Sequence, residues 1–328
     1  MNPLVALGIK SSMAKQITGI HHVTAIAGDP QKNIDFYAGV LGLRLVKLTV
    51  NYDDPGTYHL YYGDYSGHPG TILTFFPWPN VPRGTAGAGQ MTVTSFSVPR
   101  GSFSYWLERL GAAGVDVRGP AFRFDEQVLW FRDPDGMAIE LIEGEDTRPA
   151  WDGGPIPVEA AIRGFHSATL AVARLDASTR LLTSVMGFRK TGNEANRHRF
   201  QTGSGQPHQI VDLIETPRQQ RGLQGAGSVH HIAWRAPSDA EQLEWRANLV
   251  SAGHSVTPVT DRTYFHSIYY REPSGILFEI ATDPPGFTVD ESLPELGHKL
   301  VLPAWLEPSR EELSAILPKL ERFEVQHA

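Results

Sequence analysis

The 328-residue chain repeats itself, and this repeat limits the folds that it can adopt. The segment ITGIHHVTA at 17–25 aligns with IRGFHSATL at 162–170. A longer segment, RGTAGAGQMTVTSFSVP at 83–99, aligns with RGLQGAGSVHHIAWRAP at 221–237. The strings FRDPDGMAIELI and YREPSGILFEIA then close two of the repeated units in the same way. The sequence therefore contains four similar units in a row.

Each unit has the same order of expected elements. It opens with a strand of alternating residues, such as 22–26, continues with a stretch of helical period, such as 35–41, and ends in two or three further strands. The turns DPDG and EPSG place proline and glycine where a chain reversal needs them. We predict four βαβββ modules, at about 16–80, 85–147, 161–216 and 225–283.

The modules indicate an α+β protein with two open, curved, mixed β-sheets that resemble partial barrels. A stretch rich in proline and glycine separates the second module from the third, as is typical of a boundary between domains. The predicted division is an N-terminal arm at 1–15, a first module pair at 16–147, a linker at 148–160, a second pair at 161–283 and a C-terminal tail at 284–328. The tail is expected to contain a short helix near 310–320.

Equivalent positions in the four modules identify the residues that depart from the common scaffold. The position of the first histidine of each His-His pair is polar in every copy, as His21, Thr92, His166 and His230. The next position carries His22, Val93, Ser167 and His231. A position in the closing strand carries Thr74, Glu140, Asp212 and Glu279. Only the fourth module has both an imidazole at the second position and a glutamate in the closing strand.

The orientation of each His-His pair decides which rings can share a cavity. Neighbouring strand residues point to opposite faces, so we assign the second ring inward, where the variable position lies, and expect His166 to be an outward surface or interlayer residue. Pairing module 1 with 2 and 3 with 4 leaves no cavity with three ligands. Pairing module 1 with 4 brings His22, His231 and Glu279 together, so we predict this arrangement, with module 2 paired with 3. Glu140 is then a structural residue or a relic of a former site.

Two imidazoles and one carboxylate are the ligand set that suits a ferrous ion left open to oxygen and substrate. Mn(II) or another divalent ion can also occupy such a set. The chain has no cysteine, which excludes disulfides, iron-sulfur clusters and a thiol nucleophile. The sequence thus predicts a non-haem metal centre with nitrogen and oxygen ligands only.

The same motifs resemble the vicinal oxygen chelate superfamily of glyoxalases, bleomycin-resistance proteins and extradiol dioxygenases. Within it, ITGIHHVTAIAGDP, GSVHHIAWR and GILFEIA look like the hydroquinone-type ring-cleaving dioxygenases, over about residues 16–310. The resemblance implies that the iron ligands are His22, His231 and Glu279. It also implies a surrounding shell that contains Arg262 and Tyr269, with His21 and His230 beside the ligands.

The activity implied is the opening of a hydroquinone- or catechol-type diol with O2, with both oxygen atoms incorporated. Arg262 is expected to stabilise negative charge, and Tyr269 or His266 to donate or accept protons. Two other classes stay open. One is a glyoxalase-like, metal-dependent isomerase or lyase, and the other is a metal-free binding protein of the resistance type.

Composition limits the partners. The formal net charge of −7 and the absence of a basic run argue against binding to nucleic acid. No apolar stretch of 18 residues and no signal-peptide pattern occurs, so we expect no membrane insertion and a cytoplasmic location. Exposed sheet edges make a homodimer the expected assembly.

Overall fold

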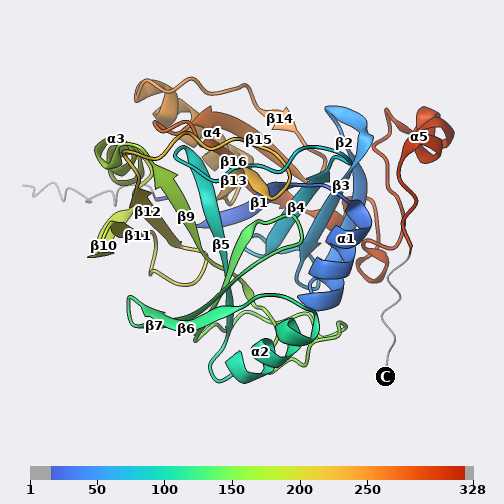
Figure 1. The fold of residues 1–328 in the computed structure, drawn as a ribbon. Coiled ribbons are helices and arrows are strands. Elements are labelled where there is room, and N and C mark those ends of the chain that lie inside the picture. The colour runs from blue at the N-terminus through green and yellow to red at the C-terminus, as the bar shows by residue number, and fades with distance from the viewer. Residues whose placement is uncertain (1–15, 322–328) are drawn as a thin grey trace, which may run out of the picture.

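The computed structural model describes residues 16–321 as two curved, mixed β-sheets of eight strands each, with the helices at the periphery (Figure 1). The first sheet contains β1 (Ile20–Ala27), β2 (Arg44–Asn51), β3 (Asp54–Gly63), β4 (Ile72–Pro77), β13 (Ser228–Ala236), β14 (Thr260–Asp261), β15 (Phe265–Arg271) and β16 (Leu277–Pro285). The second sheet contains β5 (Gln90–Pro99), β6 (Arg118–Arg123), β7 (Glu126–Arg132), β8 (Ala138–Gly144), β9 (Gly164–Val172), β10 (Arg189–Glu194), β11 (Arg197–Gln201) and β12 (Ile210–Glu215). The predicted arm at 1–15 lies outside the described residues.

Each module contributes one helix between its first and second strands. The α-helices are α1 (Pro30–Ile34), α2 (Phe103–Ala112), α3 (Leu175–Arg180), α4 (Asp239–Ser251) and, in the tail, α5 (Arg310–Ile316). Wider turns continue α1 as η1 (Asp35–Val40) and α3 as η2 (Leu181–Val185). The helices bury apolar side chains against the sheets, as Trp106 of α2 and Trp245 of α4 do. The four predicted βαβββ modules are therefore confirmed.

The crossed pairing of the modules is also confirmed. In the first sheet the order β14-β15-β16-β13-β1-β4-β3-β2 joins module 4 to module 1 through an antiparallel contact of β1 with β13. In the second sheet the order β10-β11-β12-β9-β5-β8-β7-β6 joins module 3 to module 2 through β5 and β9. Each sheet thus combines strands from both sides of the predicted linker at 148–160.

A β-bulge interrupts the opening strand of each module at the position of the first histidine of the His-His pairs. Ile20 pairs with Trp234 and His22 with Ala233, which leaves His21 as an extra residue on β1. The same count leaves one extra residue on each of the other three strands, at Thr92, His166 and His230. A bulge bends its strand and redirects the side chain of the extra residue. The strict alternation assumed from the sequence therefore fails at this position in every copy.

The turns before the closing strands have the predicted chemistry. Gly136 and Gly275 both adopt positive φ values, of 97° and 99°, which glycine tolerates best. The carboxylate of Asp133 accepts hydrogen bonds from the backbone of Asp135 and Met137, and Glu272 accepts one from Ser274. These turns fix the register of β8 and β16, on which Glu140 and Glu279 lie.

The C-terminal tail packs along module 1. It contains the short 3-10 helices η3 (Phe287–Val289), η4 (Leu293–Glu295) and η5 (Glu307–Ser309), followed by α5, which ends at Ile316, earlier than the predicted 320. The buried ammonium of Lys47 on β2 binds the carboxylates of Asp290 and Glu291. Among residues 16–321, no helix is both long enough and apolar enough to cross a membrane.

Candidate metal centre

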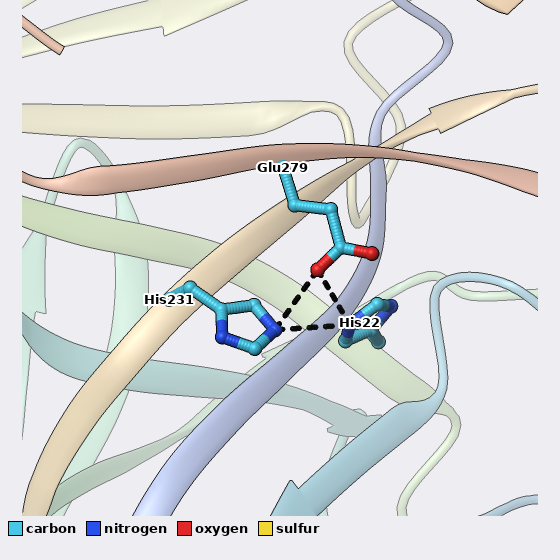
Figure 2. Close-up of side chains that lie close together, drawn as sticks. All are labelled: His22, His231 and Glu279. Atoms are coloured by element: carbon cyan, nitrogen blue, oxygen red, sulfur yellow. Dashed lines mark hydrogen bonds and ion pairs between the residues drawn. The ribbon is translucent and has the colours of Figure 1, made fainter. Parts of the chain in front are cut away.

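Three side chains from strands that are far apart in sequence converge in the first sheet (Figure 2). His22 lies on β1, His231 on β13 and Glu279 on β16, and these three strands are neighbours in the sheet. Glu279 Oε2 lies 3.0 Å from His231 Nε2 and 3.4 Å from His22 Nε2. The two Nε2 atoms are 3.3 Å apart. The structure therefore brings together the three residues that the sequence assigned as ligands.

The carboxylate of Glu279 is held in a way that leaves one oxygen for a cation. Its Oε1 accepts a hydrogen bond from the Ser267 hydroxyl. Its Oε2 is enclosed and makes no hydrogen bond of acceptable geometry, although two imidazole nitrogens are close to it. A buried carboxylate oxygen without a partner is costly. The donor set therefore fits a divalent metal ion, which would satisfy all three atoms at once.

The charges of these groups favour metal binding at neutral pH. Burial alone would raise the pKa of Glu279, but the adjacent imidazoles of His22 and His231 outweigh burial and hold this pKa well below its usual range. Burial lowers the pKa of His231 more than the nearby Glu279 carboxylate raises it. Glu279 is thus an anion and His231 a neutral imidazole, which are the states required of metal ligands.

A chain of hydrogen bonds fixes the tautomer of His22. The carbonyl oxygen of Thr282 can only accept, so His21 Nε2, which lies 3.1 Å from it, carries the hydrogen. Burial and then the nearby His22 lower the pKa of His21 well below 6.5, so its Nδ1 has a lone pair. This Nδ1 lies 2.9 Å from His22 Nδ1, which must therefore donate. In the neutral ring of His22 the hydrogen therefore lies on Nδ1, and Nε2, 3.4 Å from Glu279 Oε2, has the lone pair.

The second pair repeats this contact. His230 Nδ1 lies 2.8 Å from His231 Nδ1, and burial, followed by the nearby His231, lowers the pKa of His230 to about 3. Neutral His230 can accept the hydrogen of His231 Nδ1, which leaves His231 Nε2 free for a metal. The bulges at His21 and His230 thus place a hydrogen-bond partner behind each candidate ligand.

The three side chains open onto a cavity of about 410 Å³. Arg262 and Tyr269 lie on its wall, and Arg262 Nε donates a hydrogen bond of 3.2 Å to the Tyr269 hydroxyl. Burial and then the Glu279 charge raise the pKa of Tyr269, so its hydroxyl keeps its proton. The remaining lining residues include the apolar side chains of Phe76, Trp78, Phe265 and Leu277. His230 also lines the cavity, so both rings of this pair face it, contrary to the prediction of one ring per pair.

Two positions differ from the sequence-based expectation. His266 is not among the residues that line the cavity, and its Nδ1 contacts Asp239 Oδ1 at 2.6 Å at the start of α4. His59 of β3, which belongs to none of the repeated motifs, does line the cavity. The stretch Tyr58-His59-Leu60-Tyr61 gives the signal in the sequence, because alternate strand residues share a face and His59 is therefore expected on the same face as Tyr61.

Comparison with protein families identifies the scaffold. The family model described as Glyoxalase/Bleomycin resistance protein/Dioxygenase superfamily matches residues 19–141 and again residues 164–280. The chain belongs to this superfamily. The two matches correspond to the two module pairs in sequence, and each contains one half of each sheet.

Relatives within the superfamily carry the names of ring-cleaving enzymes. The chain is 49% identical over 316 residues to “Putative ring-cleaving dioxygenase MhqO” of Bacillus subtilis (strain 168), covering 96% of this chain and 99% of that protein. It is 35% identical over 312 residues to “Chlorohydroquinone/hydroquinone 1,2-dioxygenase” of Sphingobium indicum, covering 92% of this chain and 96% of the relative.

Solved structures agree with the fold of the superfamily. A crystal structure described as a “putative dioxygenase from Bacillus subtilis subsp. subtilis str. 168” matches with a TM-score of 0.90 and 49% identity, over 94% of this chain and 99% of that chain. Glyoxalase I from Zea mays matches with a TM-score of 0.62 and 15% identity, over 86% of this chain and 97% of that chain. The second likeness concerns the fold alone.

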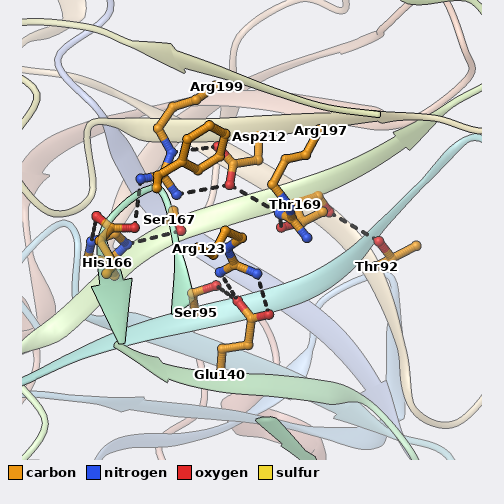
Figure 3. Close-up of polar contacts among 12 residues, drawn as sticks. Thr92, Ser95, Arg123, Glu140, His166, Ser167, Thr169, Arg197, Arg199 and Asp212 are labelled. Carbon is orange, nitrogen blue, oxygen red and sulfur yellow. Dashed lines mark hydrogen bonds and ion pairs between the residues drawn. The ribbon is translucent and has the colours of Figure 1, made fainter. Parts of the chain in front are cut away.

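The second sheet uses the equivalent positions differently (Figure 3). Arg123 binds both oxygens of Glu140, at 2.7 and 2.6 Å, and the Ser95 hydroxyl donates to the same carboxylate. Arg199 binds both oxygens of Asp212, at 2.9 and 3.1 Å. In the second sheet, arginine side chains thus neutralise Glu140 and Asp212, the carboxylates of the two closing strands.

His166 is buried, so of its two predicted places, on the surface or between layers, the surface is excluded. It is the extra residue of its bulge, and its Nδ1 lies 3.1 Å from the Ser167 hydroxyl. Its Nε2 lies 3.1 Å from the Glu126 carboxylate. His166 therefore supports the ion-pair cluster of the second sheet, in the place where His21 supports His22 in the first.

Proposed function

We propose that this protein is a ring-cleaving dioxygenase that opens an aromatic diol with O2, using a ferrous ion held by His22, His231 and Glu279. The observation that carries the proposal is the meeting of two imidazole nitrogens and an unsatisfied carboxylate oxygen at the wall of a cavity. The names of the relatives at 49% and 35% identity support the same reaction class.

The metal would supply the redox chemistry. A ferrous ion with three protein ligands keeps open positions at which a diol and O2 can be activated together. The chain can supply the ligands in the required state, because His21 keeps the hydrogen of His22 on Nδ1 and His230 is able to do the same for His231. It need not provide a redox-active side chain.

Arg262 and Tyr269 are proposed to assist the diol from the wall of the cavity. Burial would lower the pKa of the Arg262 guanidinium, but the nearby Tyr269 and the carboxylates raise it, so Arg262 stays cationic. A fixed cation stabilises the negative charge that develops when the diol gives up a proton. Tyr269 keeps its proton and can donate a hydrogen bond to an oxygen of the substrate.

The apolar residues of the cavity would hold the aromatic ring and limit the access of water. Phe265 packs on His22, with ring centroids 4.8 Å apart, and Phe76 packs edge-on to His230 at 5.8 Å. Burial of a ring among aromatic side chains is favourable and orients the ring. In such an environment the charge of Arg262 acts more strongly than it would in water.

The glyoxalase-like alternative needs a further protein ligand, and the structure offers a poor one. Module 1 carries Thr74 at the position of Glu279, and its hydroxyl contacts Thr24 at 2.8 Å and His59 at 2.9 Å. Three ligands with open positions therefore agree better with an oxygenase. The metal-free alternative leaves Glu279 Oε2 buried without a partner.

The test is reconstitution with Fe(II) without oxygen, followed by measurement of oxygen uptake with substituted hydroquinones and catechols. We expect one O2 to be consumed per diol, with a ring-opened product that contains both oxygen atoms when 18O2 is used. Turnover of a hemithioacetal without oxygen, together with no uptake for any diol, would support the glyoxalase-like class instead.

A further inference from the structure

His59 lies on the cavity wall away from the three candidate ligands. The strand order β13-β1-β4-β3 separates its strand, β3, from β1 by β4. Thr24 of β1 pairs with Thr74 of β4, which in turn pairs with Tyr61 of β3. Alternate strand residues share a face, so His59 and Tyr61 face the same cavity as His22 and Thr24.

The ring of His59 is held in a fixed orientation. It packs against Tyr61, with ring centroids 4.0 Å apart, and against Phe76, at 4.3 Å. Its Nε2 contacts the Thr74 hydroxyl at 2.9 Å. Two aromatic neighbours and one hydrogen bond leave little freedom for rotation, so Nδ1 has a defined direction.

The same hydrogen-bond chain decides which nitrogen carries the hydrogen. The Thr74 hydroxyl donates to Thr24 Oγ1 at 2.8 Å, so its oxygen accepts from His59 Nε2. Burial, and then the electrostatic effect of His22 and His231 across the cavity, hold the pKa of His59 well below 6.5, so the ring is neutral. Its Nδ1 therefore presents a lone pair.

This lone pair is available to a ligand. Among the described residues, Nδ1 of His59 has no hydrogen-bond partner, and it is not one of the enclosed unsatisfied atoms. The nearby carboxylates are already engaged, since Asp54 accepts from Trp78 Nε1 at 2.7 Å and Asp53 binds Arg262 at 3.1 Å. The wall away from the ligands thus offers a neutral acceptor for a hydroxyl group.

We propose that His59 accepts a hydrogen bond from the diol hydroxyl that lies remote from the metal ligands, and so orients a 1,4-diol in the cavity. A 1,4-diol has hydroxyls at opposite ends of its ring, one for each wall. A 1,2-diol has both oxygens at the same end and leaves His59 without a partner. This inference rests on the proposed function and adds to it a residue that selects the position of the second hydroxyl.

The experiment compares two ligands that differ in one hydroxyl. Hydroquinone and 4-methylphenol are titrated calorimetrically into the ferrous protein without oxygen, for the wild type and for His59→Phe. The phenylalanine keeps the aromatic packing but removes Nδ1. We expect His59→Phe to weaken hydroquinone binding about five- to tenfold, the value of one hydrogen bond, and to leave 4-methylphenol binding unchanged.

Two further variants separate this role from a general effect on the fold. His59→Asn keeps an acceptor near the position of Nδ1 and should recover most of the hydroquinone affinity. His254→Phe is the matched control, because His254 packs edge-on to Tyr270 at 5.9 Å and does not line the cavity. It should leave both affinities unchanged, and all variants should contain the same amount of iron.

Equal losses for the two ligands in His59→Phe, or unchanged hydroquinone binding, would overturn the role of His59. Failure of the wild type to bind hydroquinone would overturn it as well. The proposed function is judged separately, by oxygen uptake in the wild type. Normal uptake with an unchanged affinity ratio in His59→Phe would reject the inference alone, whereas absent uptake with a changed ratio would reject only the proposed reaction.

Discussion

At the residue scale, the centre depends on three atoms that have no good partner other than a cation. His22 Nε2, His231 Nε2 and Glu279 Oε2 lie 3.0 to 3.4 Å from one another. The first two are acceptors in the tautomer that His21 favours for His22 and that His230 allows for His231. Lone pairs that face each other are unfavourable unless a positive charge lies between them. This makes the three residues sensitive to substitution in a specific way.

We predict that His22→Ala, His231→Ala and Glu279→Ala each weaken iron binding by at least about a hundredfold, because a lost ligand costs more than a lost outer partner. The iron content after dialysis, measured by elemental analysis, tests this. Glu140→Ala is the control and should keep full iron content, since Arg123 and Ser95 already occupy that carboxylate. Full iron content in His22→Ala would contradict the assignment.

A second prediction concerns the effect of acid on stability. His208 is partly buried, and this burial, followed by the positive charge of Arg148, lowers its pKa to about 4. The unfolded state binds the proton below about pH 6.5 and the folded state only below about pH 4, so stability is lost as the pH falls between these values. Between pH 7 and pH 5 the loss from this residue should be about 2 kcal/mol.

Urea unfolding of the metal-free protein at the two pH values measures this loss. His208→Gln cannot titrate and should lose about 2 kcal/mol less than the wild type over the same interval. An equal loss in both proteins would mean that the acid sensitivity arises from other groups, such as His230, whose pKa is also low.

At the scale of secondary structure, the bulges explain how two adjacent histidines act together. A regular strand would point His21 and His22 to opposite faces. The extra residue at His21 instead places its ring 5.1 Å from that of His22, and the bulge at His230 does the same for His231. Both bulges recur in the second sheet, at Thr92 and His166, so they belong to the scaffold of the module.

The second sheet supplies a prediction at this scale. Among the described residues, Arg123→Ala leaves the buried Glu140 with the Ser95 hydroxyl as its one hydrogen-bond donor, and we expect a loss of about 3 kcal/mol in the free energy of unfolding. The double variant Arg123→Met with Glu140→Gln removes both charges and should recover most of this loss. Urea unfolding tests both proteins, and iron content should not change. Equal stability of Arg123→Ala and the wild type would show that the pair contributes nothing.

At the scale of the whole molecule, the candidate metal centre forms only because modules from the two halves of the chain pair with each other. His22 comes from the first half, and His231 and Glu279 come from the second. The contact of β1 with β13 joins the halves in the first sheet, and the contact of β5 with β9 joins them in the second. Neither half contains a complete sheet of its own.

We therefore predict that two fragments, divided between Gly153 and Gly154 in the linker, bind iron only when they are produced together. The N-terminal fragment alone would expose the edges of β1 and β5, and the C-terminal fragment alone would expose the edges of β13 and β9. Each fragment should therefore aggregate. Co-purification and iron analysis measure the outcome. Native iron affinity in either fragment alone would contradict the crossed pairing.

The sequence by itself determined the four modules, their element order and the residue types at the centre. These features are local, because the hydrophobic period and the turn residues occur within each module. Comparison of the equivalent residues His22, Val93, Ser167 and His231 then identifies the modules that carry a histidine. The crossed pairing followed from the chemical requirement that three ligands meet. None of this needed the register of the strands.

The tertiary structure alone decided the details that depend on contacts between distant residues. The bulges at His21 and His230, the separation of His266 from the cavity, the pairing of Arg123 with Glu140 and the position of His59 arise from strand register and side-chain packing across the sheets. A period of two residues contains no information about a bulge, because one inserted residue exchanges the faces of all that follow. The residue types of the candidate centre could therefore be predicted from the sequence, whereas their geometry depends on the tertiary structure.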